Sequence, residues 1–329
     1  MEKELRQPVD MCLKNGTLNE AAVGWSRFPV HNANLKGWGR RKRFDYWCVV
    51  SPEMILAFSV SDTDYKAATS LFFFDRKTQT ETTASSMDWF RTNPSSRAPW
   101  GSQQIRSGDK DVDISITFGD QIIALNVVTA NVNAEVEVSV PDDHQSMGVL
   151  VPWNSRRFQY TRKDNCLSAS GRVRANGVTY RLDESTTTAT TMDHGRGKWP
   201  YDTLWNWASG SGTTDGEEIG LQFGAKWTAG TPSTENALRL GGQIEKISEE
   251  LEWAYDSGDW MAPWTIRGER VDLTFTPEYH RHSEFDKKVV SSREEQVFGH
   301  FSGTVWSLAG REYRVENIFG WAEEVHRRW

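Results

Sequence analysis

The 329-residue sequence lacks long apolar runs and contains few cysteines. Its apolar stretches, such as 71–74 and 122–125, fall far short of the about 20 residues that a membrane-spanning helix needs, so we expect no integral membrane protein. The N-terminus shows no apolar core of a secretory signal, which makes the cytoplasm the expected location. The three cysteines, Cys12, Cys48 and Cys166, are too few and too scattered to predict a disulfide framework or a zinc site.

An excess of positive charge is also missing. Lys and Arg number 38 against 45 Asp and Glu, a net charge of -7, which argues against nonspecific nucleic-acid binding. The basic run 39–43 stands alone and leads into an apolar strand pattern, so a solvated strand edge is predicted there. The sequence has no P-loop, dinucleotide fingerprint, HExxH, GxSxG or CxxC motif, and we expect no cofactor. His280 and His282 lack further matching ligands, so no metal site is predicted.

Tryptophan, in contrast, is abundant. The chain has 16 Trp beside 15 Phe and 8 Tyr. Most of these rings are expected in the core, but Trp carries an N–H group and often lies half-buried where apolar and polar surfaces meet. The composition therefore indicates a pocket for a small, apolar or amphipathic molecule without identifying that molecule or the oligomeric state.

The dominant hydrophobic period is two, which predicts antiparallel strands. Segments 112–118 and 134–140 alternate strictly, and Asn176-Gly177 lies between two alternating runs, as in a tight hairpin. We therefore predict an all-β fold of two tandem lipocalin-like antiparallel barrels or sandwiches, at 1–147 and 148–329, since PDDHQSMG (141–148) resembles a junction. Residues 78–109 are predicted as a long loop, and the segment from 240 to 256 fits a helix or a strand pair.

Chemistry-bearing residues are densest between 192 and 212. Asp193 and His194 could exchange a proton, and a carboxyl group in a Trp-lined site can stay protonated near neutrality. If this part is extended, Trp205 and Trp207 share one face and Asn206 lies on the other. The alternative is a buried ionic turn in which Asp193 pairs with Arg196. The expected ligand-binding residues are Arg196, Trp199, Tyr201, Trp205, Asn206, Trp207 and Asn236.

Two further segments carry acidic side chains. In Thr234-Glu235-Asn236, Glu235 is either a strand-edge acid on a polar turn or a third catalytic candidate beside Asp193 and His194. The C-terminal tail, from Gly320 to Trp329, is predicted as a final strand or turn with surface charge pairs.

Several segments together resemble the domain-of-unknown-function 2804 family, and the resemblance covers the chain from about residue 15 to its end. They include GWSRFPVHNANL (24–35), MDHGRGKWPYDTLWNWASG (192–210), DWMAPW (259–264) and FGWAEE (319–324). That family is similar, more remotely, to the calycin-like carotenoid 1,2-hydratases and tocopherol cyclases. The resemblance implies two lipocalin-like β-domains with a ligand cavity, and Asp193, His194, Trp205 and Trp207 match an Asp-His stretch and a Trp-x-Trp pair of the hydratases.

In those hydratases an acid protonates an alkene, aromatic rings stabilise the cation and water adds. The Gly195-Arg196-Gly197 insert departs from their pattern, because its cation suits an anionic or oxygenated ligand better. Three functions stay open: a cofactor-free acid–base enzyme of hydratase, cyclase or isomerase type, a non-catalytic lipid or small-molecule carrier, and a carbohydrate-active protein with Trp platforms and the Asp193/Glu235 pair. The sequence does not decide whether the chain is an enzyme.

Overall fold

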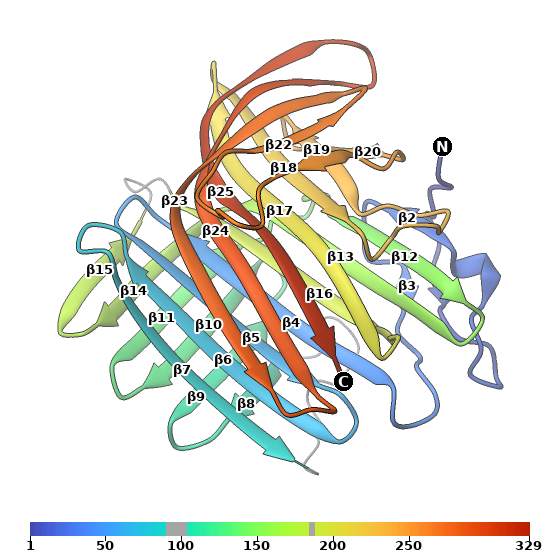
Figure 1. The fold of residues 1–329 in the computed structure, drawn as a ribbon, viewed down its shortest axis with the longest axis horizontal. Helices are drawn as coiled ribbons and strands as arrows, with labels where there is room; N and C mark the ends of the chain where they lie inside the picture. Colours follow the sequence, from blue (N-terminus) through green and yellow to red (C-terminus); the bar gives the residue numbers. More distant parts are fainter. Residues whose placement is uncertain (90–103, 184–187) are drawn as a thin grey trace.

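The computed structural model describes residues 1–89, 104–183 and 188–329, and strands form nearly all of its regular structure. Three large sheets are stacked in layers, with the nine-stranded sheet in front, the eight-stranded sheet in the middle and the six-stranded sheet behind (Figure 1). Pairing within these three sheets is antiparallel throughout the described strands. The all-β prediction is confirmed. No helix of the described residues is long and apolar enough to cross a membrane.

The eight-stranded sheet forms the middle layer. In spatial order it contains β2 (Gly24–Ser26), β12 (Met147–Asn154), β13 (Arg157–Leu167), β16 (Ala189–Lys198), β4 (Arg41–Val50), β5 (Met54–Asp62), β6 (Lys66–Asp75) and β7 (Thr80–Trp89). A short 3-10 helix, η1 (Glu20–Ala22), and the parallel pair β1 (Val9–Asp10) and β3 (His31–Asn32) lie near its β2 edge.

The six-stranded sheet covers one face of this layer. Its order is β15 (Val178–Leu182), β14 (Ala169–Ala175), β11 (Val132–Ser139), β10 (Ile122–Thr129), β9 (Val112–Phe118) and β8 (Gln104–Gly108). The alternating side chains of β9 and β11 pack on one face of β4–β6, as the period of two predicts. Asn176 and Gly177 join β14 to β15 with φ of 49° and 85°, so the predicted tight hairpin is confirmed.

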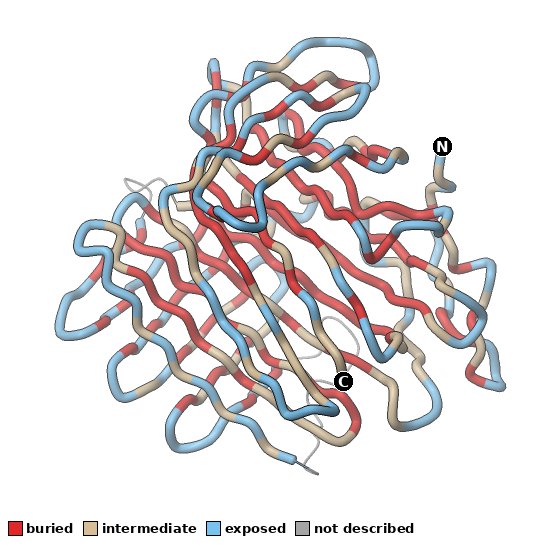
Figure 2. The backbone as a smooth tube through the Cα atoms, in the orientation of Figure 1, coloured by how far each residue is buried: buried red, intermediate tan, exposed pale blue. Residues whose placement is uncertain are grey.

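The nine-stranded sheet lies against the other face of β4–β6. Its order is β20 (Gln243–Ile247), β19 (Asn236–Leu240), β18 (Glu217–Ala225), β17 (Asp202–Thr214), β25 (Glu312–Arg328), β24 (Ser291–Trp306), β23 (Val271–Asp286), β22 (Trp264–Gly268) and β21 (Glu252–Ala254). This sheet curls around its own core, which includes Trp264, Phe275 and Phe301. The tube view shows buried residues alternating with exposed ones along the outer strands (Figure 2). The segment from 240 to 256 forms strands, not a helix.

Two organisational predictions need correction. Strands β12, β13 and β16 pair into the same sheet as β4, so the expected boundary between residues 147 and 148 does not separate the sheets. The chain passes from the eight-stranded to the nine-stranded sheet between Lys198 and Asp202. The predicted loop 78–109 is wrong for 80–89 and 104–108, which are β7 and β8: exposed positions alternate with partly buried ones along β7 and with buried ones along β8, as in strands with one covered face. Trp100 lies outside the described residues.

Candidate functional site

A cavity of about 150 Å³ lies between the eight-stranded and nine-stranded sheets. Its wall combines aromatic rings with buried charges, the combination that a site for a small amphipathic ligand needs. The aromatic and charged residues that line it are Lys42, Phe44, Tyr46, Phe58, Phe72, Lys163, Asp193, Trp199, Trp205, Trp207, Trp227, Glu235, Arg281, Glu294, Glu323 and Arg327.

Strand register brings the polar side chains together. Lys163 on β13 is the direct neighbour of Asp193 on β16, and Asp193 is the neighbour of Tyr46 on β4. On the facing sheet, Trp207 on β17 is paired with Glu323 on β25. Because directly paired residues point to the same side of a sheet, each sheet presents one row of such side chains to the cavity.

Lys163 is the centre of a buried ionic cluster. Its Nζ lies 2.6 Å from Asp193 Oδ2, 3.2 Å from Glu235 Oε2 and 4.0 Å from the ring centroid of Trp207. Burial alone would lower the pKa of Lys163, but the two carboxylates outweigh burial and raise it. Burial raises the pKa of Glu235, against the opposing effect of Lys163. Thr161 Oγ1 donates to Asp193 Oδ1 at 2.8 Å, so Asp193 is held on both oxygens.

Glycines make room for this cluster. A Cβ at Gly224 would lie 1.9 Å from Glu235 Oε1, so a side chain at that position would displace the carboxylate. A Cβ at Gly195 would lie 2.0 Å from the ring of Phe44, which crosses β16 at this point. Gly195 and Gly224 therefore admit neighbouring side chains into the cavity wall.

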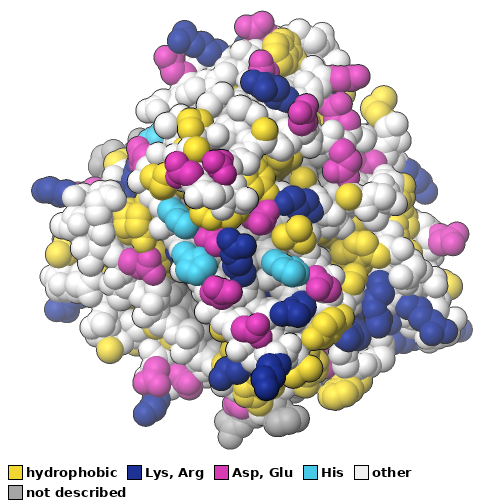
Figure 3. Space-filling view, viewed as in Figure 1, with side chains coloured by type: hydrophobic (Ala, Val, Ile, Leu, Met, Phe, Trp, Pro, Cys, Tyr) yellow, Lys and Arg dark blue, Asp and Glu magenta, His cyan; other side chains and the backbone are white. Residues whose placement is uncertain are grey.

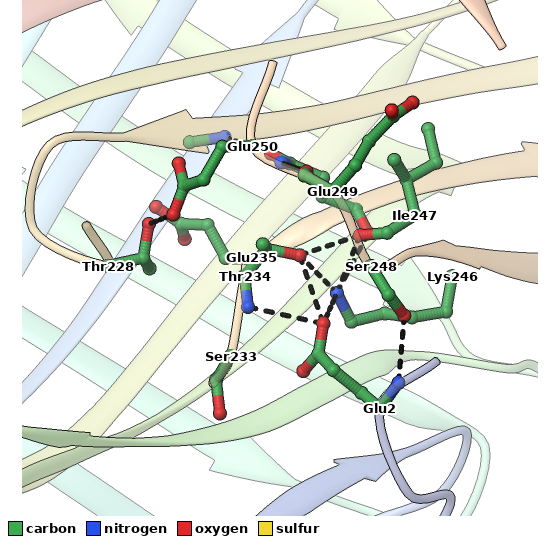
Figure 4. A network of polar contacts seen from close by, with 12 residues as sticks. Glu2, Thr228, Ser233, Thr234, Glu235, Lys246, Ile247, Ser248, Glu249 and Glu250 are labelled. Atoms are coloured by element: carbon green, nitrogen blue, oxygen red, sulfur yellow. Dashed lines mark hydrogen bonds and ion pairs between the residues drawn. The ribbon is translucent and has the colours of Figure 1, made fainter. Parts of the chain in front are cut away.

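The segment that carries Glu235 is tethered by the start of the chain. Glu2 Oε1 accepts hydrogen bonds from Thr234 N at 3.2 Å and Thr234 Oγ1 at 3.1 Å, and it forms an ion pair with Lys246 Nζ at 2.6 Å. Lys246 also donates to Thr234 Oγ1, and Glu2 N donates to Ser248 Oγ at 3.1 Å (Figure 4). These contacts fix the backbone next to Glu235.

Glu323 faces the ionic cluster from β25. Trp205 Nε1 donates to its Oε1 at 3.0 Å, and Gln296 Nε2 donates to its Oε2 at 2.9 Å. Burial, followed by the nearby charge of Glu294, raises the pKa of Glu323 to about 8. At neutral pH this carboxyl group is therefore protonated. Tyr46 lines the same wall, and burial raises the pKa of its phenol well above the usual range.

The family model described as Domain of unknown function (DUF2804) matches residues 2–329. The chain belongs to this family. No protein with curated annotation matches the sequence. The DUF2804 chain and a protein of Nitrosomonas europaea described as a candidate AttH have similar structures, with a TM-score of 0.52 at 12% identity, covering 87% of this chain and 92% of that one. Kievitone hydratase from Nectria haematococca is similar with a TM-score of 0.51 at 9% identity, covering 88% and 89%. These likenesses concern the fold.

The predicted site residues of this DUF2804 chain fall into two groups. Asp193, Glu235, Trp199, Trp205 and Trp207 all line the cavity. The expectation that His194 and Arg196 share it is wrong. Residues 189–198 form strand β16, in which successive side chains alternate between the two faces, so side chains 194 and 196 point away from Asp193.

On the opposite face of β16, His194 and Arg196 bind a different carboxylate. His194 Nδ1 lies 2.7 Å from Asp45 Oδ1, and Arg196 Nη2 lies 2.8 Å from Asp45 Oδ2. Burial, then the charge of Arg196, lowers the pKa of His194 to about 4, so His194 is neutral at pH 7. Burial works against ionisation of Asp45, but Arg196 and His194 outweigh it and lower its pKa to about 2. Arg196 thus forms a buried ion pair, as the alternative prediction had it, but its partner is Asp45 and not Asp193.

Three other predicted ligand-binding residues lie outside the cavity wall. Tyr201 is 39% exposed and donates to Val289 O. Asn206 is on the opposite face of β17 from the two tryptophans, as predicted, where it donates to Glu323 O at 3.0 Å. The Asn236 side chain binds the backbone of two neighbouring segments: it accepts a hydrogen bond from Gly224 N at 2.8 Å and donates one to Glu249 O at 2.9 Å.

Tyr46, Lys163 and Glu323 line the cavity but were not predicted as site residues. The tail 320–329 forms the end of β25 and carries surface charge pairs as predicted, such as Glu324 with Lys226 and His326 with Asp202, but Glu323 lies on the other strand face and is buried. The basic run 39–43 was expected at a solvated edge, yet Lys42 and Arg43 are buried. Their alternation within a strand was the signal available, because a period of two assigns Lys42 and Arg43 to opposite faces.

Charged and histidine side chains also gather on the outer surface over β23–β25 (Figure 3). His280 Nε2 lies 2.7 Å and His282 Nδ1 3.0 Å from Glu295 Oε2, so the two histidines share one carboxylate. Within residues 1–89, 104–183 and 188–329, no group of three or more His, Cys, Asp or Glu side chains has an arrangement that could hold a metal ion.

Proposed function

We propose that this DUF2804 protein is an acid–base enzyme of hydratase, cyclase or isomerase type that acts on a largely apolar molecule in the inter-sheet cavity. The observation that carries the proposal is Glu323, a buried carboxyl group with a pKa of about 8 on the cavity wall. A general acid works best when its pKa lies near the working pH, and burial of a carboxyl group produces such a value.

The facing cluster supplies a proton acceptor. Glu235 and Asp193 both lie in contact with the Lys163 ammonium, on the cavity wall opposite Glu323. Glu323 donates a proton to the ligand, and a carboxylate beside Lys163 accepts one from the ligand or from an attacking water. The net result is isomerisation or hydration. Both groups are side chains of this chain, so the proposed step needs no cofactor.

The rings narrow the type of substrate. Lys163 Nζ lies 4.0 Å from the centroid of Trp207, and Arg327 lies 5.3 Å from that of Trp205. These ring faces already contact cations, so they stabilise a new carbocation less than free rings would. A double bond polarised by a neighbouring oxygen fits the site better than an isolated alkene. Kievitone hydratase, similar in fold, is by its name a hydratase, which agrees with this reaction class.

A non-catalytic binding protein is the second candidate, because Asp193 has the contacts of a structural ion-pair partner. The carbohydrate-active alternative is less favoured. Its carboxylate pair, Asp193 and Glu235, is bridged by the Lys163 ammonium, whereas the two carboxyl groups of a glycosidase flank the scissile bond of the sugar.

The test compares Glu323→Gln with Glu324→Gln, since the second variant changes the next residue, on the opposite face of β25. Each protein is incubated in D2O with a small-molecule extract of its host cells, and deuterium incorporation is followed by mass spectrometry. We expect the wild type to label a compound, Glu323→Gln to slow labelling by about 10²–10⁴-fold, and Glu324→Gln to stay within about threefold. An unlabelled extract with wild-type protein, or full labelling with Glu323→Gln, contradicts the proposal.

A further inference from the structure

Lys42 lies at one end of the cavity and takes no part in the proposed proton transfer. It lies on β4 between Arg41 and Arg43, whose side chains pair with carboxylates at and just after the end of β5. Arg41 Nε lies 2.7 Å from Asp64 Oδ1, and Arg43 Nη1 lies 3.1 Å from Asp62 Oδ1. Lys42 alternates to the cavity side, where it is only 6% exposed.

Aromatic rings surround the Lys42 ammonium. Its Nζ lies 3.9 Å from the ring centroid of Trp199, 4.8 Å from Phe44, 4.9 Å from Trp329 and 5.4 Å from Trp205. Among the residues that the structure describes, no carboxylate lies within ion-pair distance of this nitrogen and no acceptor hydrogen-bonds to it. A buried amine without a counterion is unusual, because burying an unpaired charge is unfavourable.

The charges of the cavity wall show the same imbalance. Four basic residues line it, Lys42, Lys163, Arg281 and Arg327, and four acidic ones, Asp193, Glu235, Glu294 and Glu323. Lys163 contacts Asp193 and Glu235, while Arg281 and Arg327 both contact Glu294, at 3.0 and 3.1 Å. Asp193, Glu235 and Glu294 therefore contact the other three basic residues, and Lys42 is the basic group of the wall that no carboxylate contacts among the described residues.

We propose that the end of the cavity around Lys42 binds the carboxylate of an apolar organic acid. This deepens the proposed function, on which it rests for the identity of the cavity as a substrate site, by naming the substrate class. The carboxylate accepts a charge-assisted hydrogen bond from Lys42 Nζ, and the aromatic rings exclude water from that contact.

Burial and the neighbouring cations Arg327, Lys66 and Lys163 lower the pKa of Lys42 well below its usual range, with only Asp193 opposing them. An incoming carboxylate would reverse this effect. A cationic or neutral head group would leave the imbalance unchanged, so the charge pattern selects an anion.

Trp205 connects this end of the cavity to the proton donor. One edge of its indole donates to Glu323 Oε1, while Lys42 lies over its ring. If the carboxylate of a ligand contacts Lys42, the ligand atoms that lie about one indole width from that carboxylate are therefore next to Glu323. The inferred substrate is an acid with a short apolar segment between its carboxylate and the double bond that accepts the proton.

The experiment measures binding of three probes of equal chain length, octanoate, octan-1-ol and octylammonium, by isothermal titration calorimetry at pH 7. Wild-type protein is compared with Lys42→Met and Lys42→Gln, and Lys198→Met serves as the control. Lys198 is a partly buried lysine at the end of β16 that donates to Gly16 O at 2.5 Å and does not line the cavity.

We expect wild type and Lys198→Met to bind octanoate about tenfold or more tightly than octan-1-ol, and octylammonium most weakly. Both Lys42 variants should lose the preference for octanoate while their affinity for octan-1-ol stays within about threefold. Equal wild-type affinity for octanoate and octan-1-ol, or an unchanged preference in a Lys42 variant with the wild-type melting temperature, overturns the inference.

Failure of this inference and failure of the proposed function give different results. If Glu323→Gln labels the host extract as fast as wild type but Lys42→Met abolishes the octanoate preference, the acid-binding site stands and the catalytic proposal fails. If Glu323→Gln slows labelling but Lys42→Met keeps the octanoate preference, the catalytic proposal stands and the assigned substrate class fails.

Discussion

The two faces of strand β16 carry two ionic clusters of different kinds. On one face, Arg196 and His194 both contact the Asp45 carboxylate, and none of these three side chains lines the cavity. On the other face, Asp193 and Glu235 contact Lys163 at the cavity wall. Asp193 and His194 are adjacent in sequence, yet the period of two gives them separate environments. A charged residue thus stabilises the fold or faces a ligand according to its strand face.

The largest expected effect separates the faces by stability. Asp45→Asn leaves Arg196 as a buried cation without its carboxylate, and breaking a buried pair in this way destabilises a protein by about 3–5 kcal/mol. Asp193→Asn leaves Lys163 in contact with Glu235, so its effect should be clearly smaller. Urea unfolding of both variants gives the two values. Equal losses would show that the two clusters do not differ in this respect.

The second expected effect concerns pH and has opposite sign for Asp45 and Glu323. The pKa of Glu323 is raised to about 8, so from about pH 4.5 to 8 the folded protein keeps a proton that the unfolded chain releases. Rising pH therefore lowers stability through this group, by up to about 1.4 kcal/mol per pH unit. The pKa of Asp45 is lowered to about 2, so its contribution is present above about pH 4 and is lost as pH falls toward 2.

Urea unfolding of wild type and Glu323→Gln at pH 5, 6.5 and 8 checks this prediction. The variant should gain stability relative to wild type as the pH rises, because its amide does not titrate. A constant difference between the two proteins would mean that Glu323 is already ionised at pH 5 in the folded state.

The smallest expected effect concerns Tyr201, which the sequence suggested as a ligand-binding residue. Tyr201→Phe removes one hydrogen bond to Val289 O at an exposed position, so its unfolding free energy should change by no more than about 0.5 kcal/mol. Octanoate affinity, measured by calorimetry, should stay at the wild-type value. A tenfold loss of affinity would return Tyr201 to the binding site.

Local sequence patterns were enough to predict the all-β class, the hairpin at Asn176-Gly177 and the shared face of Trp205 and Trp207. These features depend on alternation and turn chemistry within a few neighbouring residues, which a single segment displays. The same alternation would have placed Asp193 and His194 on opposite faces once residues 189–198 were taken as a strand.

Which strand faces meet depends on the packing of the sheets. Glu323 is 130 residues from Asp193, and the pKa of its carboxyl group is raised to about 8 because the packing of the two sheets buries it beside Glu294. Lys42 likewise has no carboxylate partner among the described residues, because rings from Trp199, Trp205 and Trp329 close around it. Burial and through-space charge set these properties, and neither follows from local sequence, because each depends on segments that the sheets bring together from distant parts of the chain.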